Sequence, residues 1–274
     1  MIKRVSVLLL LVAGCGLRAV GVGPSQSEGG DGGASTSPDG GSDTQDAGGE
    51  LDATVDATPI DASSPDAGPP AIVASASARS RDVTLPAPTK AGDLLVVLFA
   101  QNQDSSSAAV TSITDDATGG SDTFVSANQR STNDSCGISA EIWFARNIRA
   151  GATHVSIDVS SSNWYDAWVV EVSGLATSGA ADNGGVASSQ SKNTLLTAPQ
   201  VAVSGAPALV VSVAQSCSSD NGVASGVHNG NPFSALTALE GNGAAYYLAN
   251  ATGTFGAVFD SGDYEWNAST AAFR

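Results

Sequence analysis

From residue 71 onward, short apolar runs alternate along the chain with clusters of Gly, Asn, Asp and Ser. Apolar runs of strand length between turn-forming residues are typical of a β-sandwich or barrel, and helical periodicity is nearly absent over the same stretch. We therefore expect an all-β fold consisting of a single antiparallel β-sandwich. The predicted strands cover residues 71–78, 82–86, 93–101, 109–114, 122–127, 138–147, 153–160, 165–173, 184–190, 195–203, 207–215, 234–239, 244–250, 254–259 and 264–273.

Three of these runs also predict how their strands are buried. The runs LLVVLFA (94–100) and ALVVSVA (208–214) are apolar throughout, which indicates central strands that are covered on both faces. The run THVSIDVS (153–160) alternates instead. We expect its Val and Ile side chains to face the core and its Ser and Asp side chains to face solvent.

The chain begins with the features of an export signal. Two basic residues precede the apolar run VSVLLLLVA (5–13), and small residues lead into Cys15. This order is typical of a secretory signal peptide, and the run is about half the ~20 residues that span a bilayer. The residues VAGC (12–15) resemble the lipobox of bacterial lipoproteins. The alternative is an ordinary secretory signal with a chance cysteine.

The lipobox resemblance implies an anchor and a location. It implies a signal peptide over residues 1–14 and a mature chain that starts at a lipidated Cys15. Acyl chains on this residue would hold the protein to a membrane. Residue 16 is Gly rather than Asp, which favours the outer membrane of the cell envelope, facing the periplasm or the exterior.

Residues 15–70 differ in composition from the rest of the chain. They are rich in Gly, Ser, Asp, Ala and Pro, with ten acidic residues and no Lys or Arg between Glu28 and Asp66. Such a segment cannot bury enough apolar surface to offset its ordering entropy, and its like charges extend it. We expect a disordered acidic linker over residues 15–70, followed by one domain over residues 71–274.

The charge of the domain limits its partners. Residues 71–274 hold eight basic and seventeen acidic residues, a net charge of −9. This balance argues against nucleic acid and anionic lipid as partners, but it is compatible with neutral glycans, cations and proteins. The loops at 104–107, 115–122 and 218–222 could hold a structural calcium ion. Turn chemistry explains the same residues without a metal, so no cofactor is required.

Two cysteines follow the predicted lipidation site. Cys136 precedes the run GISAEIWFA, and Cys217 follows the run PALVVSVAQS. In an oxidising compartment a disulfide is the expected state of such a pair. The start of one strand lies beside the end of its antiparallel neighbour, so we expect the bond to join two such neighbours. In the chain-entropy model, closing this 81-residue loop contributes about 4.5 kcal/mol of stability.

Several blocks of the domain resemble a known type of bacterial protein. In order, they are AGDLLVVLFA, EIWFARNIRAGATHVSIDVSSSNWYDAWVVEVSGL, LTAPQVAVSGAPALVVSVA and WNASTAAF, spread between residues 80 and 274. They resemble an uncharacterised family of extracellular β-sandwich domains in secreted and phage-tail-associated proteins. The resemblance implies a jelly-roll or concanavalin-like sandwich. The family has no established activity, so the resemblance supplies no catalytic residue.

Three carboxylates are candidates for catalysis. Alternation places Glu141 beside Trp143 on one strand face, and a carboxylate next to an aromatic ring suits a sugar-cleaving cleft. Glycosidases need a second carboxylate at about 5 Å or about 6.5–9.5 Å, which Asp166 or Glu171 could supply. Exposure on a strand, or pairing with an arginine, explains the same residues without catalysis.

Aromatic residues interleaved with polar ones indicate ligand binding more strongly, because a sugar ring presents a C–H face and a polar rim. Core packing is the alternative explanation for the same rings. The candidate ligand-binding residues are Trp143, Trp164, Trp168, Tyr264 and Trp266.

The sequence leads to one principal hypothesis and two alternatives. The principal one is a surface-exposed lipoprotein that displays a non-catalytic binding module for a glycan or a surface protein. The alternatives are a polysaccharide hydrolase that uses the carboxylates above and a purely structural envelope protein.

Overall fold

The computed structural model describes residues 68–102, 109–133, 135–161, 164–217, 232–239 and 242–274. The predicted signal peptide, the lipidated Cys15 and the linker up to residue 67 lie outside the described residues. The candidate calcium loops at 104–107 and 218–222 lie outside them as well. Within the described ranges, no helix is long and apolar enough to cross a membrane.

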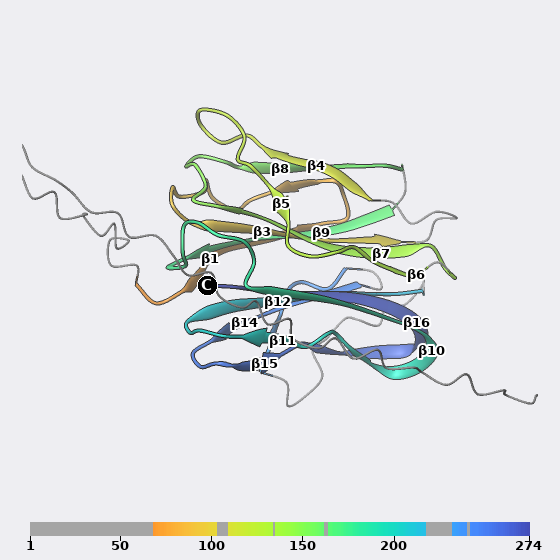
Figure 1. Ribbon diagram of the computed structural model, residues 1–274. Coiled ribbons are helices and arrows are strands. Elements are labelled where there is room, and N and C mark those ends of the chain that lie inside the picture. The colour runs from red at the N-terminus through yellow and green to blue at the C-terminus, as the bar shows by residue number, and fades with distance from the viewer. Residues whose placement is uncertain (1–67, 103–108, 134, 162–163, 218–231, 240–241) are drawn as a thin grey trace, which may run out of the picture. The chain divides into compact units, whose positions relative to one another are not determined.

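Every regular element in the described ranges is a β-strand, and all strand pairs are antiparallel (Figure 1). The predicted all-β, antiparallel sandwich is confirmed, while its jelly-roll connectivity stays a prediction. The strands are β1 (Ala71–Ala78), β2 (Asp82–Thr84), β3 (Leu94–Asn102), β4 (Val110–Asp115), β5 (Val125–Ser126), β6 (Ser131–Asn133), β7 (Ile138–Arg146), β8 (His154–Val159), β9 (Trp164–Ser173), β10 (Asn183–Thr197), β11 (Val201–Val203), β12 (Ala208–Ser216), β13 (Ser234–Ala235), β14 (Asn242–Ala249), β15 (Gly253–Phe255) and β16 (Val258–Phe273).

These strands form four sheets, stacked as layers in Figure 1. A six-stranded sheet, with order β1-β9-β3-β7-β5 and β6 also paired to β7, packs against a five-stranded sheet with order β10-β16-β12-β14-β13. The three-stranded sheet β2-β8-β4 covers the outer face of the first large sheet. The two-stranded sheet β11-β15 covers the outer face of the second.

Each space between layers holds a hydrophobic core. The central core, between the two large sheets, contains Trp168 and Phe273. The first outer core lies between β2-β8-β4 and the six-stranded sheet, and Phe99 belongs to it. The second outer core lies between the five-stranded sheet and β11-β15, and Phe259 belongs to it. The two large sheets are therefore covered on both faces.

This layering explains the two continuous apolar runs. Both β3 and β12 send alternate side chains into the central core and the others into an outer core. The prediction that both strands are central and covered on both faces is confirmed. The alternating run of β8 is confirmed too, because Val155 and Ile157 are buried while Asp158 is exposed.

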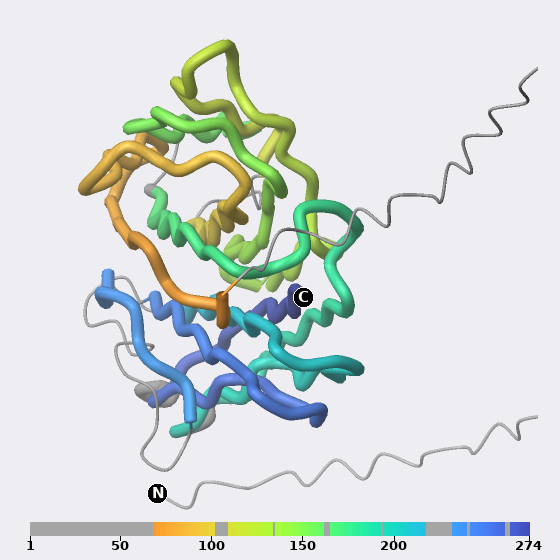
Figure 2. Tube along the Cα trace, turned by 90° about the vertical axis from the view of Figure 1, so that its left-hand side faces the viewer, coloured from red at the N-terminus to blue at the C-terminus, as the bar shows by residue number. Residues whose placement is uncertain are grey.

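The two halves of the domain share one topology. In the first half, β1 to β9, the main strands are ordered first, fourth, second and third, as β1-β9-β3-β7. In the second half, β10 to β16, the order β10-β16-β12-β14 is the same. Each half also has an outer antiparallel pair, β2 with β8 and β11 with β15. Figure 2 shows the first half, in orange to green, stacked on the second, in teal to blue.

Polar side chains join the two large sheets along one side. Three side chains from the segment around β6 each donate a hydrogen bond to a carbonyl of β10, at alternate residues of this edge strand. The donor and acceptor residues are Asn128 and Gly185 (3.1 Å), Ser131 and Ala187 (2.9 Å), and Asn133 and Ser189 (3.1 Å). Over residues 185–189, one edge of β10 pairs with β16, and the other edge is hydrogen-bonded by these side chains rather than by a strand.

The strand boundaries differ from the prediction where polar residues lie inside long strands. The polar stretch near Asn193 suggests a break, but β10 continues through it, and shifts in register with β16 absorb the irregularity. The strand expected over 234–239 is limited to β13. The strand β6 was not predicted, because its sequence STN has no apolar residue.

Candidate functional site

Glu141 holds two groups of the first half together. It lies on the face of β7 that points toward β2-β8-β4, and it is buried. Its Oε1 accepts a hydrogen bond from the backbone N–H of Val110 (2.9 Å), and its Oε2 accepts one from Trp143 Nε1 (3.0 Å). Burial raises the pKa of Glu141 against the lowering effect of these two donors. The carboxylate therefore fixes β4 to β7.

Asp166 and Glu171 are also buried and also have partners. Asn242 Nδ2 donates to Asp166, and Arg79 Nε lies 3.9 Å from the same carboxylate. The backbone N–H of Lys90 donates to Glu171 Oε1 (2.7 Å). Each carboxylate thus ties together segments that are distant in sequence.

The structure does not bring these three carboxylates together as a catalytic pair. Asp166 faces the central core and Glu141 the first outer core, so they lie on opposite faces of one sheet. Glu141 and Glu171 share a face, but they pair with β3 at Phe99 and Leu95. Four residues along a strand correspond to about 13 Å, which exceeds the spacing that glycosidases use.

Sequence reasoning missed a second carboxyl group beside Glu171. Asp93 lies close enough to Glu171 for the two carboxyl groups to influence each other, and burial raises the pKa of both. The charge of Asp93 raises the pKa of Glu171 further. Asp93 directly precedes β3, and only the pairing of β3 with β9 places it there, so no local signal in the sequence could have indicated it.

The four candidate aromatic residues whose side chains the structure describes do not gather on one surface. Trp168 is fully buried and donates to the carbonyl of Thr237 (2.7 Å), and Trp266 belongs to the second outer core. Trp143 is partly buried and packs against the first outer core. Tyr264 is 38% exposed. The side chain of Trp164 lies outside the described residues.

The two cysteines predicted to pair lie at disulfide distance, with 5.8 Å between their Cα atoms. The sequence suggested that the strands next to these cysteines are neighbours in one sheet, but they belong to different sheets. Cys136 precedes β7 of the six-stranded sheet, and Cys217 follows β12 of the five-stranded sheet. Each cysteine position indicates the end of a strand but not the sheet that the strand joins. The bond therefore links the two halves.

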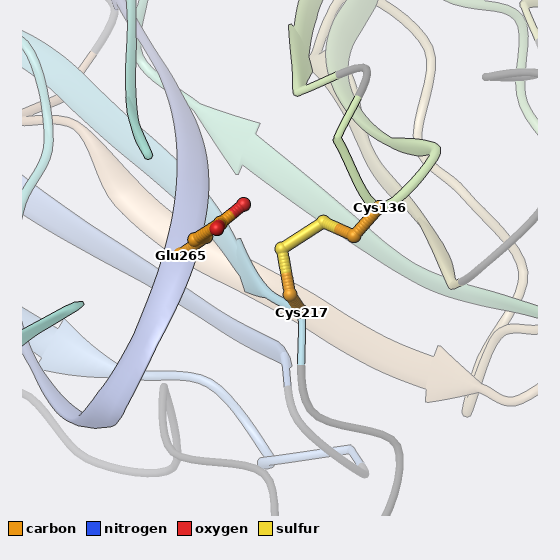
Figure 3. Close-up of side chains that lie close together, drawn as sticks. All are labelled: Cys136, Cys217 and Glu265. Carbon is orange, nitrogen blue, oxygen red and sulfur yellow. A yellow bond between two sulfur atoms is a disulfide. The ribbon is translucent and has the colours of Figure 1, made fainter. Parts of the chain in front are cut away.

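Glu265 on β16 lies next to this disulfide, with its carboxylate toward the two sulfurs (Figure 3). Ser135 Oγ donates to Glu265, and the backbone N–H of Cys217 donates to the Glu265 carbonyl (2.8 Å). These contacts hold the start of β7, the end of β12 and the middle of β16 close together around the bond.

The described calcium-loop candidate, residues 115–122, is organised by its own hydrogen bonds. Asp115 Oδ1 accepts from the backbone N–H groups of Ala117 (3.1 Å) and Asp122 (3.2 Å). Asp122 accepts from the backbone N–H of Arg149, whose Nη1 donates to the carbonyls of the turn. These contacts are the turn chemistry that the sequence offered as the alternative to a metal.

A cleft of about 460 Å³ opens where β7 and β16 end. It is lined by Ala176, residues 178–182, Arg146 and Arg274. The two arginines are 128 positions apart, and the fold alone brings them together. Sequence reasoning did not identify this cleft, because neither arginine belongs to a motif.

Arg146 is the central residue of the cleft. Its Nη1 donates to the carbonyls of Ala176 (2.6 Å) and Arg274 (2.7 Å), and its Nη2 donates to that of Ala180 (3.2 Å). Its guanidinium carbon lies 5.8 Å from the ring centroids of Phe144 and Phe273. A planar cation over aromatic rings is a favourable contact. Arg146 is therefore held by its main-chain oxygen acceptors and by the two rings.

Arg274 is the more accessible cation. Its Nε donates to Asp182 Oδ2 (2.7 Å), and its side chain is 50% exposed. Among the described residues, neither of its Nη groups has a hydrogen-bond partner. These groups are therefore available to a ligand in the cleft.

The linker enters the domain close to this cleft. Gly174 has φ of +77°, and a side chain at this position would collide with the backbone of Gly68 and Pro69. The close approach places residues 68 and 69 against the turn that leads to Ala176, at the border of the cleft.

The chain matches no protein-family model, and neither a curated protein nor a solved structure is significantly similar to it.

Proposed function

We propose that this chain is a lipid-anchored protein of the cell envelope whose β-sandwich binds a glycan or another envelope component without cleaving it. The Arg146–Arg274 cleft carries the proposal. Its volume of about 460 Å³ lies within the ~300–1,000 Å³ of small-molecule sites. Its lining offers guanidinium, hydroxyl, carboxylate and carbonyl groups, which complement the hydroxyl groups of a sugar.

The anchored part of the proposal rests on the sequence. The VAGC string at 12–15 resembles a lipobox, and the acidic residues 15–70 would separate the domain from the bilayer. The resemblance to extracellular sandwich domains of jelly-roll or concanavalin type points to the same compartment. A location at the outer membrane belongs to the proposal.

The hydrolase alternative has no supporting geometry in Glu141, Asp166 and Glu171. Each of these carboxylates is buried and holds a backbone or side-chain donor, and no two of them have the spacing that glycosidases use. The proposed module does not depend on any of the three.

The test uses the full-length protein in detergent, immobilised and exposed to a panel of neutral and acidic polysaccharides and isolated envelope fractions. Retention and the release of reducing ends are measured on the same samples. We expect retention of at least one polymer without release. Replacing Ser178 by Trp should fill the cleft and abolish retention, whereas Ser160→Trp, at an exposed site after β8, should leave it unchanged.

Each outcome separates the hypotheses. Retention that Ser178→Trp does not reduce would remove the cleft from the proposal. Release of reducing ends that Glu141→Gln abolishes would replace the binding module by the hydrolase. Absence of retention on the whole panel would favour a structural envelope protein.

A further inference from the structure

The cleft holds two guanidinium groups on a domain whose side chains are acidic on balance. Arg146 and Arg274 bring the two guanidinium groups and Asp182 brings one carboxylate, and the main-chain oxygen of Arg274, the last residue of the sequence, accepts from Arg146. The side chains of residues 71–274 as a whole have a net charge of −9. Burial lowers the pKa of Arg146; Asp182 opposes this effect and the nearby Arg274 adds to it. Asp182 and the main-chain oxygen of Arg274 hold the two like charges together in this partly desolvated site, and a bound anion would stabilise them further.

The cleft also has N–H donors without acceptors. Arg146 Nε is buried and has no hydrogen-bond partner among the described residues. Among the described residues, the two Nη groups of Arg274 also have no acceptor, and the side chain that carries them is 50% exposed. A guanidinium edge with two parallel N–H groups matches the two oxygens of a carboxylate better than it matches a single hydroxyl group.

We propose that the cleft binds a carboxylate-bearing sugar, such as a uronic acid residue of an acidic polysaccharide. The carboxylate pairs with the Nη groups of Arg274, and the sugar ring lies against the small side chains of residues 178–181. Ser178 adds a hydroxyl group that can bond to the ring substituents. This inference rests on the proposed function and names the ligand class of the same site.

The experiment compares two probes that share one sugar backbone and differ at the carboxyl groups, which are charged in one and methylated and neutral in the other. Trigalacturonic acid and its methyl ester are titrated calorimetrically into the full-length protein in detergent at low ionic strength. The acid should bind at least tenfold more tightly than the ester. Replacing Arg274 by Gln should weaken binding of the acid tenfold or more and leave binding of the ester unchanged. Added salt should weaken the acid selectively.

Arg149 supplies a matched control. Its side chain is also 50% exposed, and it also pairs with a largely buried aspartate, Asp122, at 3.8 Å. Arg149→Gln removes the same charge away from the cleft, so it should not change the affinity for the acid. Asp182→Asn should raise this affinity severalfold, because it removes the carboxylate that competes for Arg274. Asp182→Asn keeps the inference testable if Arg274→Gln folds poorly.

The outcomes distinguish this inference from the proposed function. Equal binding of the acid and the ester, or equal losses in Arg274→Gln and Arg149→Gln, would overturn the inference. Binding of neutral sugars that Ser178→Trp blocks would leave the proposed function standing. Absence of binding to every polymer tested would reject both.

The acidic residues that precede the domain provide one further check. Asp61 and Asp66 lie a few residues before Gly68, which contacts the turn bordering the cleft. The double variant Asp61→Asn/Asp66→Asn should bind the acid as the wild type does. A tenfold gain would assign the cleft to carboxylates of the chain itself and overturn the assignment to a free sugar.

Discussion

In the first half of the sandwich, large side chains such as Phe99 and Ile157 fill the outer core, and three strands cover it. In the second half, the outer core contains many alanines, among them Ala214, Ala245 and Ala268, and only β11 and β15 form its covering sheet. The two halves have the same strand order. One topology therefore accommodates a thick outer layer or a thin one, according to the size of the side chains between the sheets.

The central strands of the two halves add a second difference. LLVVLFAQN of β3 and ALVVSVAQS of β12 share the pattern LVV followed by AQ. Yet Leu95 points into an outer core, whereas Leu209, at the matching letter, points into the central core. A shift of one residue reverses the face of every side chain in a strand. Because both strands are buried on both faces, an apolar pattern is compatible with either register.

Removing the bond between the halves should have the largest effect on stability. The double variant Cys136→Ser/Cys217→Ser opens a loop of 81 residues, and the chain-entropy model gives a loss of about 4.5 kcal/mol. Urea unfolding of the variant and the wild type measures it. If reductant lowered the stability of the double variant as much as that of the wild type, the effect would not come from this bond.

Phe99→Ala should be nearly as costly. The ring is fully buried and lies 5.5 Å from the ring of Tyr165, so its removal leaves a cavity in the first outer core. Such a substitution costs roughly 3–5 kcal/mol. A loss below about 1 kcal/mol by urea unfolding would show that this core can collapse around the gap.

Ala214→Leu tests the second half by overfilling instead of emptying. The second outer core is packed around small side chains, so a larger one must displace its neighbours. The expected loss is about 1–3 kcal/mol. A gain in stability would mean that the second outer core contains unfilled space. Small side chains packed tightly would then not explain the thin layer.

The smallest expected effect depends on pH and concerns the first half only. Burial raises the pKa of Glu171 and Asp93, so the folded state retains protons that the unfolded state releases above its own carboxyl pKa values. Stability from these groups therefore falls as pH rises from about 4 toward neutral. Glu171→Gln should be more stable than the wild type at pH 7, and this advantage should shrink toward pH 4.

Asp116 provides a control of opposite sign. Although burial opposes the shift, hydrogen bonds from His154 and Thr153 lower the pKa of Asp116 in the folded state. Its contribution is present at neutral pH and is lost as pH falls. Asp116→Asn should therefore lose stability at pH 7 and approach the wild type in acid. Identical pH profiles for the two variants would contradict both assignments.

Turn residues and apolar runs were sufficient to predict most strands, because Gly, Asn and Asp interrupt the apolar pattern at nearly every loop. They could not predict which sheet each strand joins. For this reason the strands next to Cys136 and Cys217 were expected in the same sheet. The candidate site was harder to predict from the sequence than the sheets. Arg146 and Arg274 meet only because two strands from different halves end side by side. Such proximity is a property of the complete topology.

The hydrogen bonds along β10 have a consequence for many copies of the protein kept at high density. An unpaired edge strand is a template on which a second molecule can add its own strand, and repetition of that step builds fibres. On β10 the side chains of Asn128, Ser131 and Asn133 already occupy the alternate carbonyls that an incoming strand would need. Over residues 185–189, a neighbouring copy therefore meets an edge whose outward carbonyls are already occupied.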